Sequence, residues 1–528
     1  MAGKTVDESE DNIVSTTSGP VKGMTVDGIS CYLGIPYAAP PIGDLRWRPP
    51  VSPEPWEKPR KVTKLGPACP QTEVALMPSI GEMSEDCLTL NIWTQARSES
   101  DSFPVMVFIH GGGFSRGTAT EPAYNGTCLA QKGIVLVTIN YRLGAFGFLA
   151  HPILTAESSH KSSGNYGIMD QIMALKWIQE NIRQFGGNPN NVTIFGHSAG
   201  GASVPALMVS PLAKGLFHRA IAQSGGYVPR RLRHLIKSQY GLESMESMGL
   251  RFAERLGVNT TVNPLEEMRT KPWPDVVESW SKTVLNRLAC TGFAGGWILN
   301  HLIVDGYVLK QSPGQAFRDG KQHNIPFMTG TTADEGTVLA LLISIPTAER
   351  YRSYLEKSFG EISQEVLELY PACENASAPQ ALSNLLGDSF VCGARVLADG
   401  MSSVQPKTYL YQFAMQPEVF LYEIPGVDEW ELKRNFGCYH AAELPYIFHF
   451  CPNNEFTEDD DKFSEEIAGY WTRFAQNGDP NGEGATHWPA YNHSEEKHLI
   501  LDIPIKIGKH LNKRTCDFID ELDEARQP

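Results

Sequence analysis

The chain has 528 residues, of which 41 % are apolar and ten are tryptophan, so it can bury a large core. Its formal net charge is −15 and it has no dense cluster of lysine and arginine, which argues against a nucleic-acid partner. No segment approaches the roughly 18 consecutive apolar residues that a membrane span needs.

No internal repeat or Gly/Ser-rich linker divides the chain, which favours one large α/β domain over residues 13–528. The acidic residues 1–12 are expected to form a disordered tail. Because this start has no apolar leader, we expect a cytoplasmic protein on the chain as given, or a secreted one if a leader was removed. The ten cysteines include no C-x-x-C pair and no metal-ligand spacing.

The first hundred residues contain two short strand-like segments, 29–33 and 88–93, between proline-rich loops. Proline removes a hydrogen-bond donor, so we predict edge strands and wrapping loops here. Residues 105–109 and 134–139 are continuous apolar runs, typical of strands buried on both faces, and each precedes a glycine-rich loop.

Apolar positions recur at helical spacing from 166 to 185, where Gly186 and Gly187 follow. A β-branched run at 192–195 predicts a buried strand, and small residues after Ser198 predict a closely packed helix. This order is typical of a parallel sheet, whose ligands lie at the carboxyl ends of the strands.

Later segments give weaker signals. Residues 230–300 are mixed and helical in pattern, 325–329 and 408–413 predict strands, and 463–474 predicts an amphipathic helix. A glycine-led loop with His440 precedes an apolar run at 444–450.

The sequence Gly196-His-Ser198-Ala-Gly200 is a G-x-S-x-G pattern between the predicted strand and helix. Such a turn holds a serine hydroxyl in a strained, exposed position suited to a nucleophile. The alternative is a serine that only caps the helix.

A nucleophilic serine needs a base and an acid that orients the base, and in this class of sheet the acid precedes the histidine. Glu335 follows a predicted strand, with Asp334 as the neighbouring candidate. Either carboxylate alone is equally compatible with an N-cap or a solvated loop.

The base must come from the histidines after the acid, and His440 is the candidate in a glycine-led loop. His449 lies in an apolar run and is expected to be a core residue. The other candidates lie in polar stretches: His487, His493, His498 and His510.

His110 is followed by Gly111, Gly112 and Gly113 at the end of a predicted buried strand. Unshielded glycine N–H groups suit a developing oxyanion, and the N–H of Ala199 would complete the hole. A flexible turn or a phosphate cradle is the alternative, but no G-K-[ST] sequence follows.

Taken together, these motifs resemble those of the type-B carboxylesterases of the α/β-hydrolase superfamily, the group that includes the cholinesterases. The matching segments span most of the chain: 32–38, 45–50, 84–93, 110–114, 140–149, 164–167, 196–201, 223–225, 333–336 and His440. The resemblance implies an α/β-hydrolase fold, with a large, mostly parallel twisted sheet, helices on both faces and long insertions.

The resemblance also implies the site. It gives Ser198 as nucleophile, Glu335 as acid and His440 as base, with Gly112, Gly113 and Ala199 as oxyanion donors. Ser224 would contact a residue of the triad without touching the substrate. Cys69 would form a disulfide with Cys87. No metal or cofactor is required, the partner would be a small-molecule ester, and we expect a monomer or homodimer.

Departures from the cholinesterase pattern narrow the substrate. Residues 70–86 contain no aromatic side chain, and Thr337, Val338 and Leu339 follow the acid, so a cation-π site for choline is not expected. His197 stands where cholinesterases have glutamate. We therefore expect hydrolysis of neutral esters through an acyl-enzyme.

The alternatives are a catalytically silent binding or adhesion protein, or, among enzymes, a lipase, a thioesterase or a detoxifying esterase for a bulky ester. A lipase would carry an apolar lid, for which region 270–300 with Trp273, Trp280, Phe293 and Trp297 is a candidate.

Overall fold

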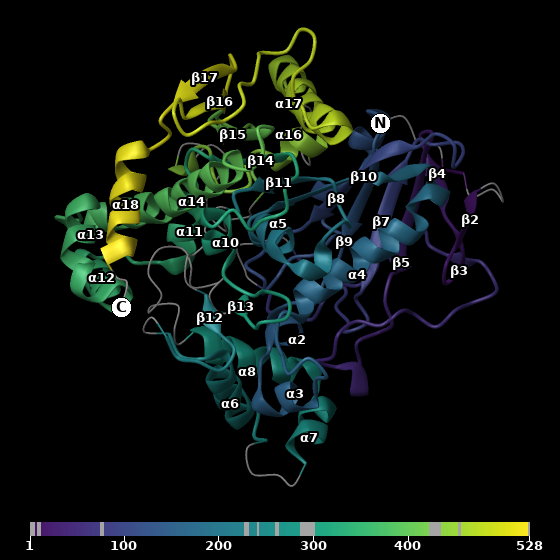
Figure 1. Ribbon diagram of the computed structural model, residues 1–528, viewed down its shortest axis with the longest axis horizontal. Coiled ribbons are helices and arrows are strands. Elements are labelled where there is room, and N and C mark those ends of the chain that lie inside the picture. Colours follow the sequence, from purple (N-terminus) through teal and green to yellow (C-terminus); the bar gives the residue numbers. More distant parts are fainter. Residues whose placement is uncertain are drawn as a thin grey trace.

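The computed structural model describes residues 6–7, 12–73, 79–225, 232–239, 242–258, 263–285, 301–421, 435–451 and 456–525. A twelve-stranded twisted sheet crosses the described part of the molecule, with helices on both of its faces (Figure 1). The strands follow one another across the sheet as β1 (Val6–Asp7), β4 (Met24–Val26), β5 (Ile29–Pro36), β7 (Thr89–Thr94), β9 (Val135–Ile139), β8 (Phe103–Ile109), β10 (Gly187–His197), β11 (Arg219–Gln223), β14 (Phe327–Thr332), β15 (Thr408–Phe413), β16 (Lys497–Leu501) and β17 (Lys506–Lys509).

Every neighbouring pair from β9 to β16 is parallel, whereas the pairs at both ends of the sheet are antiparallel. The expected α/β-hydrolase fold, mostly parallel in its sheet, is confirmed. Because parallel strands point the same way, the loops after β8, β10, β11 and β14 all leave the sheet at one edge.

Alternate side chains of β8 belong to the two hydrophobic cores on opposite faces of the sheet. Val105, Val107 and Ile109 pack in the core with α4 (Tyr166–Asn181) and α5 (Ala199–Val209). Met106 and Phe108 pack in the other, with α16 (Leu444–Phe448) and α17 (Glu458–Asn477). The predicted buried strands and the predicted helix that becomes α4 are confirmed.

The remaining helices and small sheets surround this framework. The helices are α1 (Thr127–Gln131), α2 (Gly144–Phe148), α3 (Pro152–Glu157), α6 (Met245–Arg255), α7 (Pro264–Thr270), α8 (Trp273–Leu285), α10 (Pro313–Arg318), α11 (Gly336–Ile343), α12 (Ala348–Phe359), α13 (Ser363–Leu369), α14 (Ala378–Ser402) and α18 (Lys513–Ala525). The small sheets join β2 (Ile13–Thr16), β3 (Gly19–Lys22) and β6 (Arg60–Lys61), and β12 (Arg233–His234) with β13 (Ile303–Val304).

The prediction that the early strands lie at an edge is wrong. β5 pairs with both β4 and β7, and β7 pairs with both β5 and β9. The prolines remove no hydrogen bond from the interior of these strands, because they lie in the loops around them. The exception in position is Pro36, the last residue of β5. Of the expected tail, the described residues Val6–Asp7 form β1, paired with β4.

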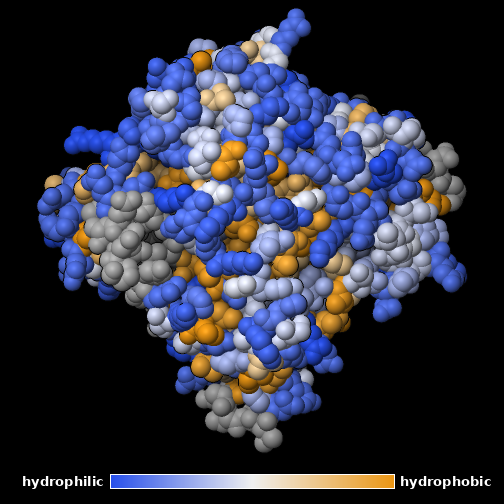
Figure 2. All heavy atoms as spheres, in the orientation of Figure 1, coloured by the Kyte–Doolittle hydropathy of each residue, from blue (hydrophilic) through white to orange (hydrophobic). Residues whose placement is uncertain are grey.

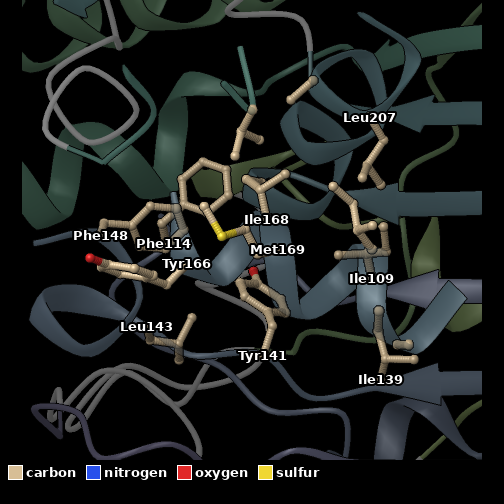
Figure 3. Close-up of a cluster of buried hydrophobic side chains, with 14 of the residues drawn as sticks. Ile109, Phe114, Ile139, Tyr141, Leu143, Phe148, Tyr166, Ile168, Met169 and Leu207 are labelled. Carbon is tan, nitrogen blue, oxygen red and sulfur yellow. The ribbon is translucent and has the colours of Figure 1, made fainter. Parts of the chain in front are cut away.

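Part of the proposed lid is core. Trp280 on α8 is buried and packs edge-on against Phe252 of α6. Phe293 and Trp297 lie outside the described residues. Farther along the same core, Phe114, Phe148 and Tyr166 gather beside the ends of the central strands (Figure 3).

A buried ion pair ties the loop after β9 to α4. The guanidinium of Arg142 donates to both carboxylate oxygens of Asp170, at 2.8 and 2.7 Å, and the Arg142 backbone N–H also donates to Asp170 at 3.0 Å. Both side chains are almost fully buried, so each charge depends on the other.

The expected bond between Cys69 and Cys87 is not formed in this structure, which holds both residues as buried thiols. The two thiols lie within hydrogen-bond distance of each other. This hydrogen bond with Cys69, together with burial, raises the pKa of the Cys87 thiol well above its usual value. Among the described cysteines, a disulfide joins Cys392 of α14 to Cys516 of α18, 124 residues apart, and no spacing pattern had singled it out.

The surface seen in Figure 2 is mainly hydrophilic, broken by scattered apolar patches, as the excess of acidic residues leads one to expect. Within the described ranges, no helix is long and apolar enough to cross a bilayer.

Candidate active site

Ser198 lies on a strained turn between β10 and α5. Its φ and ψ angles are 56° and −119°, a combination that non-glycine residues avoid. The glycines around it are required by close packing, because a methyl group on Gly200 would lie 1.9 Å from the carbonyl oxygen of Ile109 at the end of β8. The turn therefore holds the serine directly beside the end of the neighbouring strand.

The side chain of Ser198 makes no capping hydrogen bond to α5, so the alternative of a helix-capping serine is not supported. The Ser198 backbone N–H donates instead to the carbonyl oxygen of Gln223, the last residue of β11, at 2.9 Å. Neither the cap of α5 nor the contact with Gln223 uses the hydroxyl of Ser198.

Glu335 follows β14 and is fully buried, as is Ser224 after β11. One carboxylate oxygen, Oε2, accepts a hydrogen bond from Nδ1 of His440. The other, Oε1, accepts from the Ser224 hydroxyl at 2.5 Å and from the Thr332 backbone N–H at 2.8 Å. A buried carboxylate held by three donors has a fixed position and in turn fixes the orientation of the imidazole.

Asp334, the other candidate acid, has a different contact. Its exposed carboxylate accepts a hydrogen bond at 2.8 Å from the backbone N–H of Cys438, two residues before His440. It therefore holds the loop that carries His440 but does not contact the imidazole in any contact the structure gives. Of the two carboxylates, Glu335 is the one positioned to orient a base.

The glycine loop after β8 approaches the serine turn closely. A methyl group on Gly111 would lie 3.1 Å from Cβ of Ser198, and Gly112 and Gly113 have φ angles of +107° and +62°. Among the described residues, the N–H groups of Gly112, Gly113 and Ala199 have no hydrogen-bond acceptor. Free N–H groups beside a serine can hold an oxyanion.

Two histidines beside the turn are neutral for the same reason. His197 is buried with its ring centre 4.5 Å from that of His440, and burial, then the charge of His440, lowers its pKa well below the usual value. Burial lowers the pKa of His110 to about 4, and its ring stacks on Tyr141. In the described part of the chain, no three histidine, cysteine or acidic side chains gather as metal ligands do.

Two residues near the site were given no role by the sequence patterns, although Gln223 lies in the matching segment 223–225. Glu443 is the N-cap residue of α16 and is fully buried. The side chain of Gln223, the last residue of β11, donates to its Oε1 at 3.2 Å. Burial, followed by the negative charge of Glu335, raises the pKa of Glu443 to about 7. Its position three residues after His440 was the only available signal.

The remaining candidate histidines have other contacts. Nδ1 of His449 lies 3.0 Å from the hydroxyl of Ser464, and His493 pairs with Asp399 at 3.0 Å. Only His440 contacts the buried acid in the contacts that the structure gives for these three histidines.

A serine on a strained strand-to-helix turn, a glycine loop with free N–H groups and a buried acid-imidazole pair, all at one edge of a parallel sheet, define a serine hydrolase. Comparison with known proteins makes the class more specific. A model of the Carboxylesterase family matches residues 10–519.

Two curated relatives are similar over nearly the whole chain. The fumonisin B1 esterase of Sphingopyxis macrogoltabida is 36 % identical, covering 93 % of this chain and 86 % of its own. The para-nitrobenzyl esterase of Bacillus subtilis (strain 168) is 35 % identical, covering 94 % and 96 %. A solved structure titled PNB esterase matches with a TM-score of 0.78 and 33 % identity over 96 % of this chain and 99 % of that one.

The chain therefore belongs to the carboxylesterase family. It is a serine hydrolase of carboxylic esters.

Proposed function

We propose that Ser198 is the nucleophile, His440 the general base and Glu335 the acid that orients it, with Gly112, Gly113 and Ala199 as oxyanion donors. The observation that carries this proposal is the fully buried Glu335 carboxylate, which accepts from His440 on one oxygen and from Ser224 on the other. Nδ1 of His440 is thereby occupied, which leaves Nε2 for the serine proton.

The reaction follows from these roles. Ser198 Oγ attacks the ester carbonyl while Nε2 of His440 takes its proton, and the three backbone N–H groups hold the oxyanion. The tetrahedral intermediate collapses, the alcohol leaves with the proton from His440, and an acyl-serine remains. Water then repeats the sequence and releases the acid.

We propose neutral esters as the preferred substrates. The Glu335 carboxylate already accepts hydrogen bonds from His440, Ser224 and the N–H of Thr332, and Glu443 is fully buried. The imidazole beside the serine, His197, is held neutral by burial. Neither these groups nor the residues after Glu335 offer a charge or an aromatic face to a cationic alcohol.

A bulky ester, one of the alternatives that the sequence left open, is a second candidate, and one relative is named for a single substrate as fumonisin B1 esterase. The two candidates differ in the size of the group they must accommodate. A panel of 4-nitrophenyl esters from acetate to palmitate, with a choline ester and its uncharged 3,3-dimethylbutyl analogue, separates them.

The roles are tested with the same panel on the wild type and Ser198→Ala. We expect hydrolysis to fall by about 10⁴-fold or more, and a fluorophosphonate to label Ser198 alone. Wild-type activity should fall in acid, because protonated His440 cannot accept the serine proton. Activity retained in Ser198→Ala, or a rate that stays flat down to pH 4, would rule out the proposed roles.

A further inference from the structure

Gln223 makes contacts with both halves of the proposed machinery. Its backbone carbonyl oxygen accepts the N–H of Ser198 at 2.9 Å, at the strained turn. Its side-chain Nε2 donates to Oε1 of Glu443 at 3.2 Å, three residues beyond His440. One residue therefore joins the turn that carries the nucleophile to the segment that carries the base.

The side chain of Gln223 is itself held in place. Its Oε1 accepts a hydrogen bond from Nε1 of Trp471 on α17 at 3.3 Å, so both ends of the amide are used. Gln223 and Trp471 are both fully buried. A buried amide bonded at both ends has one orientation, because turning it over would face donor to donor.

The register of the sheet places this link beneath the nucleophile. Gln223 of β11 is the direct partner of His197 of β10, and side chains at partnered positions of parallel strands point to the same face. The ring of His197 contacts that of His440. His197, Gln223, His440 and Glu443 therefore form one polar cluster beside an otherwise apolar core.

The carboxyl group of Glu443 is fully buried and depends on the side chain of Gln223 for a hydrogen bond. Its second oxygen, Oε2, has no hydrogen-bond partner among the described residues, so the amide of Gln223 is the one side-chain donor seen there. Without that donor the buried carboxyl group would lose the one side-chain hydrogen bond that fixes its position.

We propose that Gln223 and Glu443 are positioning residues that set the distance between Ser198 and His440. This inference rests on the proposed roles of those two residues. Neither Gln223 nor Glu443 touches the reacting atoms. Their effect is geometric, and displacement of a reacting group by about 1 Å can cost on the order of 100-fold in rate.

The test compares Gln223→Met, Glu443→Met and Glu443→Gln by kcat and KM on 4-nitrophenyl acetate and by the rate of fluorophosphonate labelling. Gln223→Met should lower kcat and labelling together by roughly 10- to 100-fold, with KM changed by less than about threefold. Glu443→Gln keeps an acceptor for Gln223, so its kcat should exceed that of Glu443→Met by at least about tenfold.

Gln322→Met is the matched control, because Gln322 is also a buried glutamine. Its side chain donates to the backbone oxygen of Gly400, and no contact given for the described residues joins it to the site. It should retain kcat. The double variant Gln223→Met/Glu443→Met should be no slower than the slower single variant, because both changes break one link.

A Gln223→Met enzyme with kcat within threefold of the wild type would overturn the inference, as would additive losses in the double variant. If Gln223→Met fails to fold, the comparison of Glu443→Gln with Glu443→Met decides, and equal kcat values would overturn the proposal. If the fluorophosphonate does not label Ser198 in the wild type, the proposed nucleophile is refuted instead.

Discussion

Replacing Glu443 by glutamine should shift the stability of the variant relative to the wild type upward as pH rises. Burial and the charge of Glu335 raise the pKa of Glu443 to about 7, from an ordinary value of 4.5. A carboxyl with a raised pKa contributes stability that is fully present below about pH 4.5 and is lost as pH rises through about 7. Each pKa unit corresponds to about 1.4 kcal/mol, so the total loss is about 3 kcal/mol.

Glutamine has no titrating proton, so the variant does not lose this part of its free energy of unfolding as pH rises. Between pH 5 and pH 8.5 the free energy of unfolding of Glu443→Gln should rise by about 2 to 3 kcal/mol relative to the wild type. With an unfolding entropy of about 2 cal/mol/K per residue, the difference in Tm should grow by about 2 to 3 °C.

Thermal melts at a series of pH values measure this difference. Glu356→Gln on α12 is the control, because it removes one exposed carboxylate and leaves the buried cluster intact. Its Tm difference from the wild type should vary little. A Tm difference for Glu443→Gln that stays constant within about 0.5 °C from pH 5 to pH 8.5 would refute the reasoning.

Three further outcomes are expected. Glu335→Gln should lower kcat on a neutral nitrophenyl ester by about 10⁴-fold, whereas Asp334→Asn, which can still accept from Cys438, should cost less than tenfold, and equal losses would contradict the choice of acid. Asp170→Ala should lower the free energy of unfolding in urea by about 3 to 5 kcal/mol because Arg142 is left buried and unpaired, and a loss below 1 kcal/mol would count against that pair. Cys392→Ser opens a loop of 124 residues and should cost up to about 5 kcal/mol, with faster proteolysis of α18, and an unchanged digestion pattern would exclude the tether.

The parts of the site that the sequence predicted are those with strict local requirements. Gly200 can only be glycine because its neighbour is the carbonyl oxygen of Ile109, and this constraint appears in the sequence as a short pattern. The central strands were equally predictable, since a strand buried on both faces needs an unbroken apolar run.

Acid and base needed more than local pattern. Position in the sequence alone did not decide between Glu335 and Asp334 as the acid, or between His440 and several other histidines as the base. The resemblance to a known family selected one of each, and the structure shows that pair in contact. The catalytic roles themselves stay predictions until the variants are measured.

The contact between Gln223 and Glu443 could not be predicted from local sequence. They are 220 residues apart, and their contact exists only because β11 ends beside the first turn of α16. The edge strands failed for a related reason: prolines in loops look the same in sequence whether the strands between them are central or peripheral. The Cys392–Cys516 bond likewise depends on how α18 packs on α14.

The strained turn at Ser198 has a consequence during synthesis. The ribosome makes the chain from its N-terminus, so the glycine loop after β8 and Ser198 emerge first, and His440 follows 242 residues after Ser198. At about 5 to 20 residues per second, this interval lasts on the order of 12 to 50 seconds. On the proposed roles, the nucleophile exists for that time without its base, and the nascent chain gains its activity toward esters only when the segment after β15 has folded onto the sheet.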